Sequence, residues 1–107
     1  MVAYDLVTVE LKPSRTVFLQ ATDPDTLDWL IATLDDVYPY SVKDKLTVTF
    51  PSEKKFRYGL TCQDARVVVF FLIKELCQNG WEPVGCSMEN TWVTGGFFQK
   101  ERQVDKE

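Results

Sequence analysis

TCQDARVVVFFLIKELCQNGW, residues 61–81, decides the fold, because it places the longest apolar run of the chain between a helix start signal and a helix stop signal. Thr61 followed three residues later by Asp64 matches a capping box. In Asn79-Gly80 a left-handed residue can end a helix, and Trp81 is the apolar residue that follows. The run VVVFFLI alone would also suit a buried strand, but about twenty residues between two helix signals is too long for one. We therefore predict a central helix across this stretch.

The amino-terminal part of the chain alternates apolar and other residues, which is the period of a half-buried strand. The alternation covers residues 3–11, where Asp5 interrupts it, and residues 16–21. Between them, Lys12-Pro13-Ser14-Arg15 has the composition of a turn. The sequence therefore predicts a hairpin at this end.

A first helix is predicted to begin at Asp23-Pro24, since aspartate caps a helix well and proline fits the first helical position. It is predicted to end at Tyr38-Pro39-Tyr40, because a residue before proline is driven out of the helical region. The apolar residues in between fall on one helical stripe, namely Leu27, Leu30, Ile31, Leu34 and Val37. This pattern is typical of a helix that covers a core on one side.

Two further hairpins complete the predicted elements. Residues 45–50 and 56–60 alternate around a polar connection at 51–55. Residues 81–88 and 91–102 alternate around a turn at Glu89-Asn90. Gly95-Gly96 interrupts the last strand, and paired glycines inside a strand indicate a bulge or a bend.

The predicted order is hairpin, helix, hairpin, helix, hairpin. This order indicates an α+β fold with a six-stranded, mostly antiparallel sheet and two helices packed on one face. The chain has 107 residues, of which 45% are hydrophobic, and this is enough for one core. We expect a single domain over residues 1–102 and a polar tail at 103–107.

One segment carries a resemblance. LIKELCQNGWEPVG, residues 72–85, is followed by a strand that ends in FFQKE, residues 97–101. This resembles a small uncharacterised, largely bacterial family in which a helix ends in Gly-Trp-Glu and runs into a hairpin. The resemblance covers about a quarter of the chain. It implies a helix followed by a hairpin and no particular activity.

Cysteine usage and the amino terminus favour a cytosolic protein, with the nucleus as the alternative. The three cysteines, Cys62, Cys77 and Cys86, are odd in number and show no CxxC spacing, which suits free thiols in a reducing compartment. The first residues lack a signal-peptide pattern, and no apolar run has the length of a membrane span.

The charge of the chain disfavours nucleic acid as a partner. The formal net charge is −4, whereas phosphate-binding surfaces carry an excess of lysine and arginine. Lys54, Lys55 and Arg57 cluster near one turn, and with aromatic residues on an open sheet they could bind single-stranded RNA. The aromatic submotif of such sheet-based readers is absent, so a solvated sheet face is the preferred interpretation.

Catalytic, cofactor and metal sites are not predicted. The chain contains no histidine, which excludes catalytic pairs that use an imidazole. Cys62 is the one thiol that a helix start could activate, but we interpret it as a partly buried small residue at that position. Cys77 and Cys86 fall on apolar positions and are interpreted as packing residues. We therefore expect a protein that is not an enzyme.

The acidic cluster Asp23, Asp25 and Asp28 could be taken for a cation site, but it lacks the glycine and distal glutamate of a calcium loop. Negative charge at the start of a helix, where the helix dipole is positive, explains the three residues without a metal.

Surplus apolar surface gives the leading functional hypothesis. The central helix carries apolar residues around most of its circumference, and one other helix can cover only part of it. We therefore predict an interaction module, an adaptor or a subunit of a complex, that binds a protein partner or a second copy of itself. The candidate contact residues are aromatic, as interface cores prefer: Trp29, Tyr38, Tyr40 and Phe70.

Two alternatives remain open at this point. These four aromatic residues could instead complete the domain's own core. The chain could also be a small-ligand or lipid-binding domain with an apolar pocket between the sheet and the helices.

The two predicted helices make a direct prediction about stability. Leu34→Ala and Leu72→Ala should each lower the free energy of unfolding by roughly 2–5 kcal/mol, because each would leave a cavity under a helix. Chemical denaturation followed by circular dichroism measures both values. Unchanged midpoints in both variants would contradict the helix assignments.

Overall fold

The computed structural model describes residues 3–38, 40–49, 54–89 and 92–102, with side chains placed except at 42–49, 54–55 and 92. Six strands and two helices follow one another in the predicted order. They are β1 (Ala3–Lys12), β2 (Thr16–Ala21), α1 (Pro24–Asp35), β3 (Tyr40–Thr49), β4 (Lys54–Cys62), α2 (Ala65–Gln78), β5 (Glu82–Glu89) and β6 (Trp92–Arg102). The predicted α+β class is confirmed.

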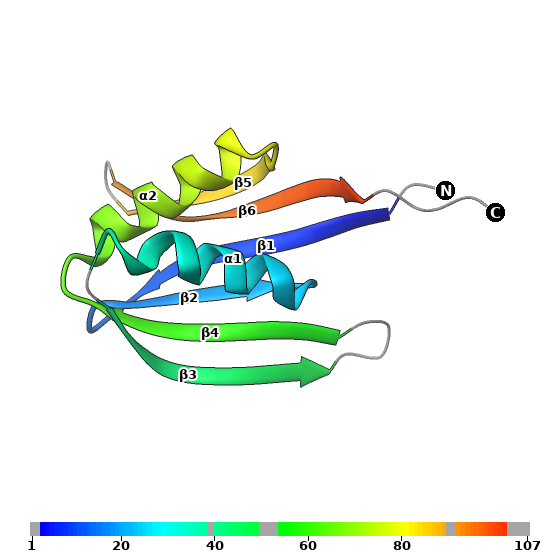
Figure 1. Ribbon diagram of the computed structural model, residues 1–107. Helices are drawn as coiled ribbons and strands as arrows, with labels where there is room; N and C mark the ends of the chain where they lie inside the picture. Colours follow the sequence, from blue (N-terminus) through cyan, green and yellow to red (C-terminus); the bar gives the residue numbers. More distant parts are fainter. Residues whose placement is uncertain (1–2, 39, 50–53, 90–91, 103–107) are drawn as a thin grey trace.

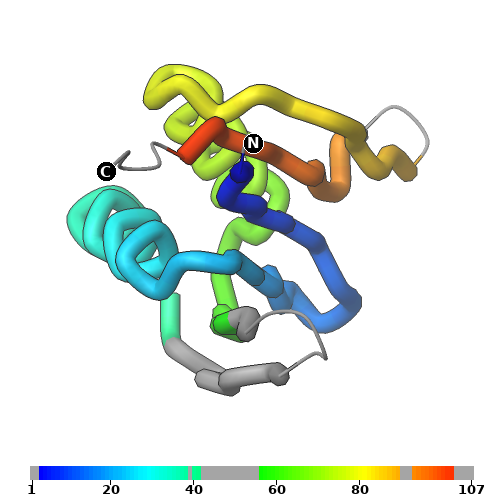
Figure 2. Tube along the Cα trace, turned by 90° about the vertical axis from the view of Figure 1, so that its right-hand side faces the viewer, coloured from blue at the N-terminus to red at the C-terminus, as the bar shows by residue number. Residues whose placement is uncertain are grey.

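The six strands form one sheet in the order β3-β4-β2-β1-β6-β5, and each pair of neighbours is antiparallel. The sheet curves, and both helices lie on its concave side (Figures 1 and 2). The two helices on one face, predicted from the sequence, are therefore confirmed.

The helices divide the inner strands between them. α1 packs against β2 and β4, whereas α2 packs mainly against β1 and β6. Leu34 of α1 and Leu72 of α2 are both fully buried. The strands contribute the other half of the core through alternate residues, which include Val7, Val9, Val17, Leu19, Leu60 and Phe98. Each helix thus fixes two strands from one side.

The first hairpin and the start of α1 agree with the sequence. Ser14 and Arg15 in the turn have φ angles of 67° and 57°, which tight hairpin turns require. The Asp23 carboxylate accepts a hydrogen bond of 3.1 Å from the Asp25 amide and caps α1, with Pro24 at the first position. Local sequence chemistry therefore explains both the turn of the first hairpin and the start of α1.

The end of α2 is the predicted glycine stop. Gly80 has a φ of +87°, the Trp81 amide donates to the Leu76 carbonyl at 2.9 Å, and the Gly80 amide donates to the Cys77 carbonyl at 3.3 Å. These two hydrogen bonds define a Schellman motif, in which the residue after the glycine folds back onto the helix. Trp81 is accordingly buried, and the chain turns directly into β5.

The predicted start of the central helix is wrong by three residues, since the cap position is Asp64 and not Thr61. Thr61 and Cys62 belong to β4, and the helix begins at Ala65, with Asp64 at the cap position but without a side-chain cap bond. Thr61 pairs with Thr16 of β2, and the Cys62 amide donates to the Arg15 carbonyl at 2.9 Å. The sheet therefore satisfies the backbone groups that a capping box would have used.

The second hairpin is longer than predicted. β3 begins at Tyr40 rather than at residue 45, and a register shift between Val42 and Asp44 hides the alternation of its first half. The predicted turn residues 51–53, Asn90 and the polar tail at 103–107 lie outside the described residues, as does the end of the predicted strand at Phe50.

The glycine pair of β6 marks an irregularity, as predicted. The register between β5 and β6 shifts next to Gly95, which pairs with Ser87 on one side and with Glu10 of β1 on the other. A side chain at Gly95 would collide with the backbone carbonyl of Val9. The close approach of β1 therefore requires a glycine here.

This close approach predicts an asymmetry between two glycines. Gly95→Ala should destabilise the fold by about 1–3 kcal/mol, because the methyl group would push β1 and β6 apart. Gly85→Ala is the matched control, since a methyl group there meets nothing within 4 Å. Its free energy of unfolding should stay within about 0.5 kcal/mol of the wild type. Equal effects of the two substitutions in urea denaturation would contradict the strand packing.

Candidate functional site

The outward side of α2 carries exposed apolar residues, as the all-round apolar pattern of this helix predicts. Its buried side consists of Ala65, Val68, Val69, Leu72 and Leu76. On the other side, Phe70 is 44% exposed and Val67 is 38% exposed. α1 and the sheet therefore cover only part of the helix, and a large aromatic side chain remains at its middle.

The flank of α2 that carries Phe70 faces away from α1. On the opposite flank, Phe71 packs edge-on against Tyr38, which follows α1, with ring centroids 5.4 Å apart. Phe70 lies about 100° around the helix from Phe71, on the same side as Arg66 and Cys77. Figure 2 shows β5 on the side of α2 away from α1. Phe70 thus lies on the exposed side of α2 and not on the flank that packs against Tyr38.

The other three predicted contact residues lie elsewhere and are partly buried. Trp29, Tyr38 and Tyr40 all pack against the core. The Tyr40 hydroxyl also donates to the Asp35 carboxylate at 3.0 Å. The structure therefore does not bring the four aromatic residues together in one patch, and Phe70 is the most exposed of the four.

β5 is an edge strand whose side chains remain exposed. All eight of its residues are exposed, including Val84 at 55% and Met88 at 57%. Cys86 pairs with Gly96, which in turn pairs with the buried Val9, so Cys86 points to the helix side of the sheet. Met88, two residues further, points to the same side. α2 does not bury these two side chains of β5.

Phe70 and Cys77 of α2 together with Cys86 and Met88 of β5 form what we name the α2–β5 face. Its four side chains are apolar or weakly polar and exposed. Exposed apolar side chains on two neighbouring elements are candidates for a contact surface, whereas isolated ones are normal on any protein. Sequence reasoning identified Phe70 but missed the β5 half, because its alternation was interpreted as one buried and one solvated side.

A cleft of about 410 Å³ lies where the start of α1 meets the end of α2 and the ends of β1 and β6. Its lining includes the indoles of Trp29 and Trp81, and Lys100 and Arg102 as cations. The carboxylates that line it are Asp5, Asp23, Asp25 and Glu101. This polar lining differs from the apolar pocket that the lipid-binding alternative requires.

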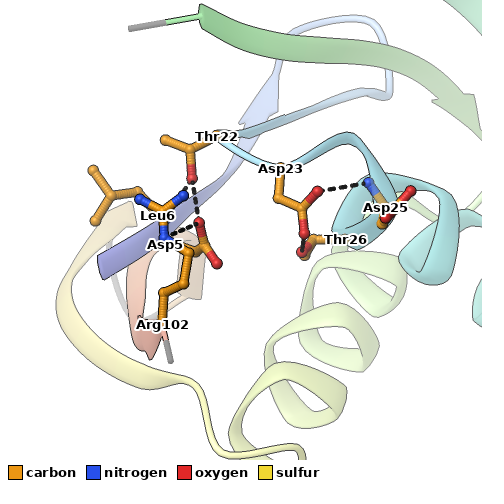
Figure 3. Close-up of polar contacts among 7 residues, drawn as sticks. All are labelled: Asp5, Leu6, Thr22, Asp23, Asp25, Thr26 and Arg102. Atoms are coloured by element: carbon orange, nitrogen blue, oxygen red, sulfur yellow. Dashed lines mark hydrogen bonds and ion pairs between the residues drawn. The ribbon is translucent and has the colours of Figure 1, made fainter. Parts of the chain in front are cut away.

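Hydrogen bonds and ion pairs within the chain already engage most of these charges. Figure 3 shows Asp5 between Thr22 and Arg102, with a 3.3 Å hydrogen bond to the Thr22 hydroxyl and a 3.8 Å contact to Arg102. Asp23 caps α1 in the same view. The Lys100 ammonium donates to the Asn79 carbonyl at 2.9 Å. These contacts fasten the ends of β1, β6 and the helices to one another.

Asp23 and Asp28 of the predicted acidic cluster have structural partners. Besides the cap formed by Asp23, the Asp28 carboxylate accepts a hydrogen bond of 3.0 Å from the Tyr58 hydroxyl. Among the described residues, no group of three or more histidine, cysteine or acidic side chains is arranged to hold a metal ion. In the same residues, no helix is long and apolar enough to cross a membrane.

The three cysteines are free, and the structure corrects their predicted surroundings. Cys62 is completely buried at the end of β4, and this burial raises the pKa of its thiol from 9.0 to about 11. A buried thiol with a raised pKa has the opposite character to an activated nucleophile. Cys77 and Cys86 are exposed rather than packed in the core, because α2 turns one toward solvent and leaves the other uncovered on β5.

Comparisons with known proteins give no match: no family model, no curated protein and no solved structure is similar to this chain.

The burial of Cys62 predicts how stability depends on pH. The thiol ionises near pH 9 in the unfolded chain and near pH 11 in the folded one, so its contribution is intact below pH 9. As the pH rises from 9 to 11 the unfolded state loses the proton first, and stability should fall by up to about 2–3 kcal/mol. Urea denaturation across this range measures the loss.

The control is Cys62→Ala, which removes the titrating group. Subtracting its pH profile from that of the wild type isolates the Cys62 contribution from other groups, such as Tyr40, whose pKa is raised by burial and by its hydrogen bond to Asp35. Identical profiles for the two proteins between pH 9 and 11 would show that Cys62 is accessible to solvent.

Proposed function

We propose that this chain is a non-enzymatic protein–protein interaction module that binds through the α2–β5 face. The observation that carries the proposal is the position of Phe70, an exposed aromatic residue on a helix flank beside a strand that no helix covers. Aromatic side chains next to other exposed apolar residues are the usual centre of a binding surface.

The geometry favours docking by side chains over strand addition at the β5 edge. A sheet edge can pair with another strand, and proteins block this with bulges, prolines and charges. β5 has register irregularities near Gly85 and Met88 and carries Pro83 near its start. It also has a glutamate at each end, Glu82 and Glu89. A partner is therefore expected to cover the α2–β5 face rather than to extend the sheet.

The small-ligand alternative has a location in the cleft between the helix ends. Its volume lies within the range of ligand sites, roughly 300–1,000 Å³. However, the Lys100 ammonium and the Asp5 and Asp23 carboxylates are engaged within the chain, so a ligand would have to displace existing contacts. A bound small molecule in native mass spectrometry of the purified chain would favour this alternative.

Removing the anchor tests the proposal. Phe70→Ser should weaken capture of a partner or of a second copy at least about tenfold, or roughly 1.4 kcal/mol, because a desolvated aromatic contact is lost. The free energy of unfolding should change by less than about 1 kcal/mol, since Phe70 does not belong to the buried stripe of α2. Affinity is measured by titration of the labelled chain, and stability by urea denaturation.

Tyr4→Ser is the matched control. Tyr4 is 45% exposed, almost the same as Phe70, but it lies on the sheet face that the helices do not cover. Binding should survive Tyr4→Ser and fail in Phe70→Ser. A Phe70→Ser chain that unfolds by several kcal/mol while association is unaffected would make Phe70 an ordinary structural residue and remove the basis of the proposal.

A further inference from the structure

The cleft between the start of α1 and the end of α2 contains a hydrogen-bond donor that the chain does not use. Trp81 lines this cleft and is only 6% exposed, so its accessible edge opens into the cleft. Its indole N–H donates to no described residue. Since no buried side-chain nitrogen or oxygen of the described residues lacks a partner, this N–H belongs to the accessible edge. A nearly buried indole N–H normally has an acceptor, which here has to come from outside the chain.

A carboxylate on the α1 wall of the cleft is also unengaged. Asp25 lies in the first turn of α1, and its amide donates to the Asp23 carboxylate (Figure 3). The Asp25 carboxylate itself accepts from no described residue. Asp5, in contrast, already accepts from the Thr22 hydroxyl. A ligand that leaves the engaged charges of the cleft as they are can therefore still bind to two groups, one anion and one donor.

These two groups lie on walls of opposite charge. The α1 wall carries Asp23 and Asp25. The wall formed by the end of α2 and by β6 carries Trp81 and Lys100, whose ammonium lies 5.9 Å from the centroid of the Trp81 ring. Lys100 keeps its hydrogen bond to the Asn79 carbonyl and adds a positive potential beside the indole. One wall thus attracts a cation and the other an anion.

The remaining charged residues of the cleft preserve this division. Arg102 lies 3.8 Å from the Asp5 carboxylate, and the two charges offset each other. Glu101 pairs with Tyr4 of β1 and alternates with Lys100, so its side chain starts from the sheet face away from the helices. Neither pair changes the sign of the α1 wall or of the Trp81 wall.

The size and the apolar part of the cleft suit a small dipolar molecule. Its volume of about 410 Å³ lies within the range of small-ligand sites. The partly buried ring of Trp29 adds an apolar contact on the α1 wall. A molecule that has an ammonium group and a carboxylate on the same carbon, with an apolar side chain, matches all three features.

We propose that this cleft binds a free α-amino acid in its zwitterionic form. Its ammonium group donates to the Asp25 carboxylate, and its carboxylate accepts from the indole N–H of Trp81 beside Lys100. Both are charge-assisted hydrogen bonds, the stronger kind. The cleft shares no residue with the α2–β5 face, so the inference goes beyond the proposed interaction function and does not depend on it.

Ligands that lack one charged end test the proposal. Isothermal titration calorimetry of the whole chain with L-leucine, L-phenylalanine and L-glutamine should give a dissociation constant below about 1 mM for at least one of them. The amine and the acid that each lack one charged group, 3-methylbutylamine and 4-methylpentanoate in the case of leucine, should bind at least about tenfold more weakly. Each of them loses one charge-assisted hydrogen bond.

Substitutions in the cleft assign the two ends of the ligand. Asp25→Asn should weaken the amino acid at least about tenfold and leave the acid unchanged, because the acid has no ammonium group. Trp81→Phe should weaken the amino acid and the acid but not the amine. Asp36→Asn is the matched control, since it removes the same charge at the other end of α1, outside the cleft, and should change binding less than about threefold. Circular dichroism checks that each variant is folded.

The outcomes decide the proposal even if Trp81→Phe does not fold, because the truncated ligands and Asp25→Asn suffice. Absence of binding of all three amino acids at up to about 10 mM overturns it. So does an amine or an acid that binds as tightly as the amino acid, or an Asp25→Asn chain that binds as tightly as Asp36→Asn. Phe70-dependent protein binding is measured separately and is unaffected by any of these results.

Discussion

Two helices cannot cover six strands, and the arrangement of this molecule follows from that constraint. α1 packs on β2 and β4, α2 packs mainly on β1 and β6, and the two strands at the edges of the sheet lie beyond these pairings. In the edge strand β5, the charged residues Glu82 and Glu89 lie at the two ends, and the residues between them are small or apolar.

The Schellman motif at the end of α2 determines where the uncovered strand lies. Its hydrogen bond from the Trp81 amide to the Leu76 carbonyl reverses the chain within three residues and buries Trp81 under the helix end. β5 therefore has to run back along α2, and Cys86 comes to the level of Phe70. A helix stop that is readable in the sequence thus produces the composite face that we propose as the binding surface.

Much of the fold could be predicted from the sequence because its signals are local. Asp23-Pro24, the stripe of leucines in α1 and Asn79-Gly80-Trp81 each act within a few residues, and the structure confirms them. The start of α2 could not be predicted, since the sheet pairing of Thr61 with Thr16 competes with a local cap and wins. The first half of β3 was missed because the register shift after Val42 breaks the alternation.

The candidate site was predictable only in part, for a related reason. The surplus of apolar residues on α2 indicates exposed surface, but sequence periodicity does not show which flank α1 leaves open. Nor does it show that β5 has no helix above it, so Cys86 was interpreted as a packing residue although the structure leaves it exposed. The extent of cover by neighbouring elements is a property of the tertiary arrangement and has no signature at the level of a single strand.

Cys86 offers the most direct test of the proposed binding surface, because a partner on the α2–β5 face covers it while the free chain leaves it exposed. The measurement is the rate constant for alkylation of Cys86, followed by peptide mass spectrometry as the concentration of the binding partner, another protein or the chain itself, increases. The proposed surface predicts that this rate constant falls as the concentration passes through the dissociation constant of the complex, and that it stays constant in Phe70→Ser. A rate constant for Cys86 in the wild-type chain that does not change when a partner binds would contradict it.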